Sequence, residues 1–82
     1  MHQSAVEDLE AIWVLVFEND SKLAADTLYT EIISCVKKIQ NDYTIGKSLE
    51  SFRGGYWLMM VGEIRVFYRV DRDDCLEVVR VI

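Results

Sequence analysis

The 82-residue sequence contains few of the residues that build metal sites and disulfide frameworks. His2 is its only histidine, and its two cysteines, Cys35 and Cys75, form no CxxC pattern. We therefore expect no metal ion and no other cofactor. Both cysteines are interpreted as small core or surface residues, without a disulfide.

The sequence also lacks a long apolar run and the features of a secretion signal. No apolar stretch approaches the roughly 20 residues of a membrane span. The first residues, Met1 to Ser4, do not form the basic and apolar regions of a signal peptide. These absences predict a soluble, cytoplasmic protein with no membrane partner.

No internal repeat, low-complexity tract or proline occurs in the chain. The shares of hydrophobic residues (51%) and charged residues (28%) are those of an ordinary globular protein and exclude disorder. A chain of this size buries roughly 60 to 65% of the surface that its unfolded form exposes, so it can fold alone. We predict one domain over residues 1–82.

The net charge of −5 is unevenly distributed along the chain. Residues 1–50 carry nine acidic residues and four lysines, whereas residues 51–82 carry five arginines and five acidic residues. Proteins that bind nucleic acid through many phosphates are normally basic. The overall charge therefore argues against general RNA or DNA binding and leaves open a local arginine site in the second half.

The first half has the pattern of two amphipathic helices. Ser4 to Glu7 fits a helix-opening capping box, and the first helix is expected to run to about Glu18. Asn19 to Ser21 is a polar break with N-cap candidates, and the second helix is expected to end near Asn41 or Asp42. So short a link predicts an antiparallel helical hairpin, whose apolar stripe requires a sheet to cover it.

The second half predicts an antiparallel meander of three strands. Residues 56–61 and 64–70 are separated by Gly62-Glu63, the spacing of a two-residue type II′ turn, and a last strand follows the acidic turn at residues 71–74. Residues 43–55 are irregular, with a short extended piece around residues 47–52. The expected fold class is α+β, with the hairpin packed on a three-stranded sheet.

Alternation assigns the faces of the middle strand. Ile64, Val66, Tyr68 and Val70 are expected to face the helices, and Arg65, Phe67 and Arg69 the open side. Trp57 and Met59 are predicted to join Phe67 on the open side. The last strand is ambiguous because the adjacent Val78 and Val79 point to opposite sides, which either a β-bulge or a covered outer face would explain.

Arginine is never neutral at physiological pH, so an arginine in a strand must face water or an anion. The candidate partner-binding residues are four arginines and three apolar residues: Arg53, Arg65, Arg69, Arg80, Trp57, Met59 and Phe67. The alternatives are structural. Arg65 would then pair with Glu63 or Glu77, Arg80 would form a cross-strand salt bridge, and the apolar residues would lie in the core.

The order of elements and several motifs resemble the RelE/ParE superfamily of bacterial toxin–antitoxin systems. Residues 5–13 resemble the family's opening helix, and residues 41–47 its post-helix turn without the usual proline. Gly62 to Tyr68, which joins a tight turn to an arginine and a tyrosine, is the most specific match. The closing residues 76–82 are closest to the ParE branch. The family's first strand and C-terminal tail have no counterpart here, so both ends look clipped and a sheet edge is expected to be open.

The resemblance implies a toxin that is neutralised by a cognate antitoxin, as in systems for plasmid stabilisation. ParE-like members inhibit DNA gyrase, and RelE-like members cleave mRNA on the ribosome. Arg65 matches the family arginine and is the only catalytic candidate, because Trp57 and Met59 stand where the nucleases place cations. We therefore predict a ParE-like toxin that acts by protein binding. The alternatives are a ribosome-dependent endoribonuclease, and a degenerate relative that only binds an antitoxin or forms a homodimer through its open edge.

Overall fold

The first helix begins where a side chain satisfies a free backbone N–H group. The structure, a computed structural model, describes all residues from 1 to 82. Helix α1 (Gln3–Asn19) follows His2, whose Nδ1 accepts a hydrogen bond from the N–H of Ser4 at 3.1 Å. The predicted capping box from Ser4 to Glu7 is therefore wrong. The N–H of His2 donates to the carbonyl of Val78 at 2.9 Å, and this anchor places the helix start ahead of Ser4.

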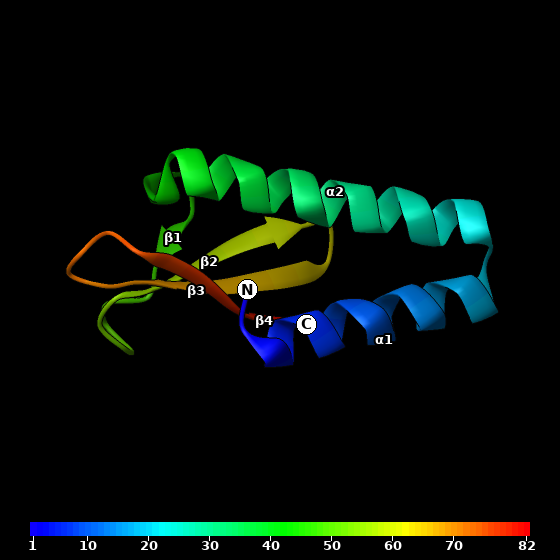
Figure 1. Cartoon of the computed structure of the whole chain (residues 1–82), viewed down its shortest axis with the longest axis horizontal. Coiled ribbons are helices and arrows are strands. Elements are labelled where there is room, and N and C mark those ends of the chain that lie inside the picture. Colours follow the sequence, from blue (N-terminus) through cyan, green and yellow to red (C-terminus); the bar gives the residue numbers. More distant parts are fainter.

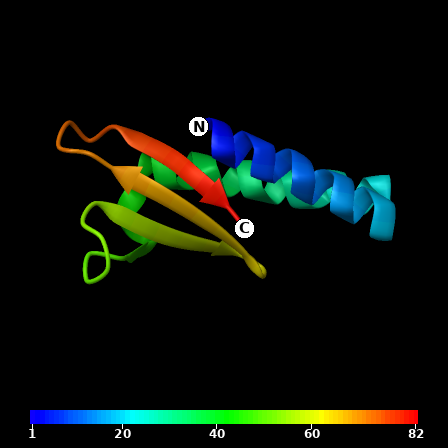
Figure 2. The same ribbon diagram turned by 90° about the horizontal axis from the view of Figure 1, so that it is seen from below.

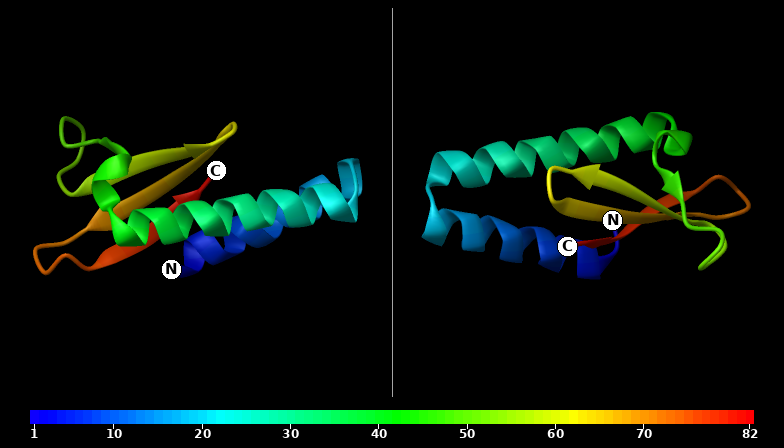
Figure 3. Two further views of the ribbon diagram at one scale, coloured as in Figure 1. Left: turned by 90° about the horizontal axis from the view of Figure 1, so that it is seen from above. Right: turned by 180° about the vertical axis from the view of Figure 1, so that it is seen from behind.

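Helix α2 (Lys22–Asn41) follows a short link and runs antiparallel to α1 (Figure 1). Ser21 caps α2 by accepting the N–H of Ala24 at 3.0 Å, and Lys38 lies in the last turn. The predicted hairpin and the ends of α2 are confirmed. The end of the hairpin at which α1 joins α2 projects beyond the sheet in both views of Figure 3. Neither helix has the length and apolar character that a membrane crossing requires.

The rest of the chain forms a four-stranded antiparallel sheet. After a short 3₁₀ turn, η1 (Tyr43–Ile45), come β1 (Lys47–Ser48), β2 (Tyr56–Val61), β3 (Ile64–Val70) and β4 (Leu76–Val81), in the spatial order β1-β2-β3-β4. The α+β class is confirmed, and the sheet has one strand more than the three predicted. The short extended piece expected around residues 47–52 contains β1, which joins the sheet by pairing with β2.

The helices lie on one face of the sheet, with α1 against β4 and α2 against β2 (Figure 2). The core consists of residues that face each other across this interface: Ala5, Leu9, Ile32, Cys35, Val36, Ile39, Val66, Tyr68, Val70, Val78 and Val81. The predicted inner face of β3 is confirmed, since Val66, Tyr68 and Val70 are buried and Arg65 and Arg69 are exposed.

Two backbone features set the register of the strands. Gly62 has φ +60° and Glu63 has a negative φ, as the predicted type II′ turn requires. A β-bulge interrupts the pairing of β3 with β4: Phe67 pairs with Arg80, Tyr68 pairs with Val78, and Val79 is the extra residue. The bulge is the first of the two explanations proposed for this strand. It places Arg80 on the outer face and Val81 in the core.

Tyr68 links the core to the segment that precedes β1. Its side chain is fully buried, and its hydroxyl donates a hydrogen bond to the carbonyl of Tyr43 at 2.5 Å. Burial raises the pKa of Tyr68, so the phenol stays protonated and keeps its role as donor. Gly46 lies against the hydroxyl end of the ring, where a Cβ atom would overlap the hydroxyl oxygen. This contact fixes the path by which the chain enters the sheet.

Candidate functional site

The side of the sheet that faces away from the helices, here called the outer face, gathers apolar side chains and arginines. Cross-strand pairs assign its members, because residues directly opposite each other share a face. Leu58 of β2 pairs with Phe67 of β3, and Phe67 pairs with Arg80 of β4. The outer face therefore consists of alternate residues of each strand and of the chain end: Tyr56, Leu58, Met60, Arg65, Phe67, Arg69, Glu77, Arg80 and Ile82.

Arg65 is the outer-face arginine that forms no ion pair. Arg69 Nη2 lies 3.2 Å from the Glu77 carboxylate, and Arg80 is paired with Asp8 of α1. The predicted alternative in which Arg65 pairs with Glu63 or Glu77 is therefore wrong. A guanidinium with no acidic partner can bind an anion or a partner's carboxylate without first breaking an existing pair.

Arg80 is held more firmly than Arg69. Its Nε and Nη2 atoms lie 2.7 and 3.1 Å from the two carboxylate oxygens of Asp8, and the N–H of Val81 donates to the same carboxylate at 2.9 Å. The hydrogen bond from Arg80 lowers the pKa of Asp8, and the carboxylate in turn raises the pKa of Arg80. The bidentate pair reaches from strand to helix, so the cross-strand partner predicted for Arg80 is wrong.

Trp57 and Met59 do not lie on the outer face, and their predicted placement beside Phe67 is wrong. Trp57 pairs with Tyr68, Met59 pairs with Val66, and both pack against the core. Across the Gly62-Glu63 turn, each odd-numbered residue of β2 pairs with an even-numbered residue of β3. A prediction that places the odd-numbered residues of both strands on one side of the sheet therefore assigns β2 to the wrong side.

The β2 residues that do accompany Phe67 are Tyr56, Leu58 and Met60, which the sequence interpretation overlooked. Counting the register from the Gly62-Glu63 turn would have identified them. Sequence interpretation also missed Phe52, whose side chain is 88% exposed in the β1–β2 loop. The neighbouring predicted residue, Arg53, lies with its guanidinium 4.8 Å from the ring centre of Tyr56 at the margin of the outer face.

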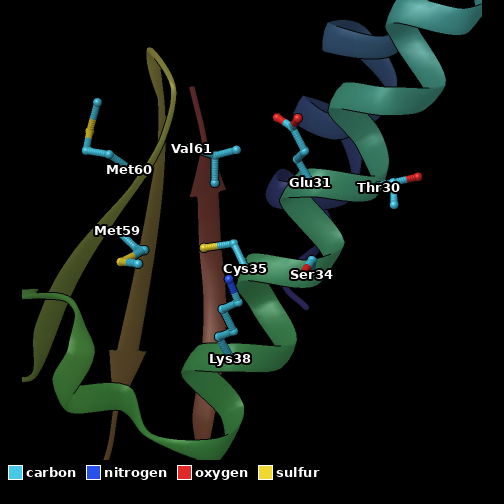
Figure 4. A pocket seen from close by; sticks show the side chains of 8 residues that line it. All are labelled: Thr30, Glu31, Ser34, Cys35, Lys38, Met59, Met60 and Val61. Atoms are coloured by element: carbon cyan, nitrogen blue, oxygen red, sulfur yellow. The ribbon is translucent and has the colours of Figure 1, made fainter.

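A groove of about 410 Å³ opens between α2 and the end of β2. Its helix side is lined by Thr30, Glu31, Ser34, Cys35 and Lys38, and its strand side by Met59, Met60 and Val61 (Figure 4). Burial raises the pKa of the Cys35 thiol, which disfavours the reactive thiolate. No group of three or more His, Cys, Asp or Glu side chains is arranged to hold a metal ion. The groove thus combines apolar side chains from β2 with polar and charged side chains from α2.

The chain matches a family of known proteins in sequence and a solved structure in fold. Residues 1–82 match the family model described as the ParE toxin of the type II toxin–antitoxin system parDE. A solved structure titled "Chromosomal ParDE TA system from P. aeruginosa" superposes with a TM-score of 0.80 at 20% sequence identity, covering 98% of this chain and 87% of that chain. None of the curated proteins matches the sequence. At this identity the structural match shows a shared fold.

Proposed function

Because the chain belongs to the ParE toxin family of type II toxin–antitoxin systems, we propose that it acts by binding two proteins and not by cleaving RNA. One protein is the cognate antitoxin, which neutralises it, and the other is DNA gyrase, the target that the ParE branch implies. The outer face of the sheet is the contact surface in this proposal, with Arg65 as its unpaired arginine.

The composition of the outer face supports protein binding. Met60 and Ile82 are each about half exposed, at 49% and 48%, and they flank Arg65 on the neighbouring strands. Phe67 lies next to them on β3. Aromatic residues, methionine and arginine are enriched at the centres of protein interfaces, where arginine is often an energetic hot spot. An apolar surface around one unpaired arginine fits this description.

The surroundings of Arg65 argue against ribonuclease chemistry. Attack of a ribose 2′-OH on the adjacent phosphate requires a base and a proton donor in addition to a cation. The residues opposite Arg65 on the two neighbouring strands are Met60 and Ile82, and neither transfers protons. The only histidine, His2, caps α1. Arg65 could hold a phosphate, but neither of its cross-strand neighbours could activate the nucleophile.

Expression of the chain, alone and together with the small protein encoded by the neighbouring reading frame, tests the proposal. We expect growth arrest, loss of gyrase supercoiling in extracts and intact mRNA, with growth restored by the neighbouring protein. Cleavage of mRNA at ribosomes would favour the endoribonuclease alternative. Normal growth with both activities intact would contradict either toxin mechanism and identify a degenerate relative.

A further inference from the structure

The loop between β1 and β2, residues 49–55, is held in shape by its own hydrogen bonds. The carbonyl of Leu49 accepts the N–H groups of Phe52 and Arg53, both at 2.8 Å, and the Glu50 carboxylate accepts the N–H of Gly55 at 3.0 Å. The N–H of Leu49 and the carbonyl of Gly55 bond to the neighbouring strands β2 and β3. A loop ordered in this way loses little conformational freedom when a partner binds.

Phe52 lies in the middle of this loop and is the most exposed of the large apolar side chains, at 88%. The loop is at the opposite end of the molecule from the link between α1 and α2 (Figure 2). It precedes the first residue of β2, whereas the groove lies beside the last residues of that strand. Single exposed apolar residues are common on protein surfaces. Phe52 differs because its backbone N–H is bonded to Leu49, so the loop presents the ring from a fixed position.

Two cations accompany Phe52, and neither forms an ion pair within the chain. Lys47 of β1 pairs with Leu58 and therefore shares the outer face, and the Arg53 guanidinium lies over the ring of Tyr56. The only carboxylate of the loop is bonded to the backbone of the loop itself. This end of the outer face therefore fits an apolar pocket that carries carboxylates at its rim.

We propose that Phe52 anchors the chain on its target, the enzyme that it inhibits, an inference that rests on the proposed function. The phenyl ring enters an apolar pocket of the target, and carboxylates at the rim of that pocket face Arg53 and Lys47. The antitoxin, in contrast, is bound without Phe52. The loop thus serves recognition of the target and takes no part in neutralisation.

A folded enzyme is favoured as the occupant because the ring projects from a loop. A ring in this position is shielded from water on all sides only inside a concave pocket, and such pockets form between several elements of a folded protein. A segment that lies flat on the outer face would cover the ring from one side only. Arg69 is opposite Tyr56 beside the loop, and Arg65 lies four residues before it on β3, about 13 Å away. A folded partner can therefore contact Arg65 and Phe52 at the same time.

Phe52→Ala and the matched control Leu23→Ala test the inference. Leu23 is also largely exposed, at 77%, but it lies in the first turn of α2 at the other end of the molecule. We expect Phe52→Ala to require at least about tenfold more protein than the wild type to inhibit gyrase supercoiling, and Leu23→Ala to inhibit as the wild type does. Both variants should bind the neighbouring-frame protein with the wild-type Kd and unfold at the wild-type urea concentration.

Equal inhibition by Phe52→Ala and the wild type would overturn the inference. A rise in the Kd for the antitoxin as large as the rise in the inhibitory concentration would also overturn it, since the loop would then serve both proteins. A wild type that inhibits no supercoiling would instead contradict the proposed function. Growth arrest on expression then decides the role of Phe52: arrest that Phe52→Ala relieves and Leu23→Ala leaves intact supports an anchor on another target, and arrest by both variants overturns the anchor.

Two further measurements address other occupants of the loop. Binding of a fluorescent single-stranded oligonucleotide that Phe52→Ala abolishes would identify nucleic acid as the occupant, although the net charge of −5 disfavours it. Dimers of the free chain in sedimentation that Phe52→Ala abolishes would identify a second copy. Either result would overturn the inference. We expect a monomer that leaves the oligonucleotide unbound.

Discussion

The contact between Gly46 and Tyr68 gives a quantitative test of the fold. Gly46 has φ −82° and ψ −178°, a conformation open to any residue, so only space prevents a larger side chain. In Gly46→Ala, the new Cβ would overlap the Tyr68 hydroxyl and lie 2.9 Å from the carbonyl oxygen of Leu58. Because Tyr68 is fully buried, its ring cannot move aside without breaking the bond to Tyr43.

The cost of Gly46→Ala follows from two contributions. Overpacking a core costs about 1–3 kcal/mol, and leaving the buried hydroxyl without its partner costs about 1–3 kcal/mol. The alanine also reduces the freedom of the unfolded chain, which offsets about 0.4–1 kcal/mol. We expect a net loss of about 1–5.5 kcal/mol, a large share of the roughly 4–12 kcal/mol typical for a domain of this length.

A double-mutant cycle in urea separates the clash from other effects. Tyr68→Phe removes the oxygen that the new Cβ would meet, so Gly46→Ala should cost about 1–3 kcal/mol less in the Tyr68→Phe background than in the wild type. If the losses of the two single variants instead add in the double variant, within about 0.5 kcal/mol, the Tyr68 hydroxyl is not what excludes a larger side chain at position 46. An unchanged urea midpoint for Gly46→Ala alone would refute the packing itself.

Two further predictions concern local stability. Asp8→Asn is expected to lower the free energy of unfolding at pH 7 by about 1 kcal/mol, whereas Glu10→Gln, at an exposed and unpaired position, should change it little. Because Arg80 holds the pKa of Asp8 below its ordinary value of 3.8, the contribution of Asp8 is complete above that pH and is lost as the pH falls through the folded pKa. Urea unfolding at several pH values should therefore show the Asp8→Asn deficit shrinking below pH 3.8, and a deficit that persists unchanged into acid would be inconsistent with the ion pair. Gly62→Ala is expected to cost about 1–2 kcal/mol through left-handed backbone strain alone, since no atom lies within 4 Å of its added Cβ; a stability equal to that of the wild type would contradict the type II′ turn.

The helical hairpin was predictable because its apolar residues recur at helical spacing. The two sides of β3 were predictable because its apolar residues alternate along the strand. The family was also predictable, since the turn and strand from Gly62 to Tyr68 form a compact motif, and the full-length family match confirms it. The start of α1 was not predictable. His2 acts as the cap because β4, at the other end of the chain, anchors it, and no local pattern contains that contact.

The candidate site was predictable only in part. The sequence identified Arg65, Phe67 and Arg69 correctly as residues of the open side, because alternation within β3 has no interruption. It misplaced Trp57 and Met59 because the register across a hairpin depends on the turn and not on residue parity. It also could not show which arginines are paired, since Asp8 reaches Arg80 only after α1 has packed against β4. The role of each residue in partner binding remains a prediction.

Inhibition of gyrase supercoiling by purified Arg65→Ala, compared with the wild type and with Arg72→Ala, tests the central claim most directly. Arg72 is an exposed arginine in the β3–β4 turn that forms no ion pair, so it controls for the loss of one positive charge. We predict that the wild type and Arg72→Ala inhibit supercoiling at similar concentrations. Arg65→Ala should require at least about tenfold more protein while unfolding at the same urea concentration. Equal inhibition by all three proteins would contradict a binding surface that depends on Arg65.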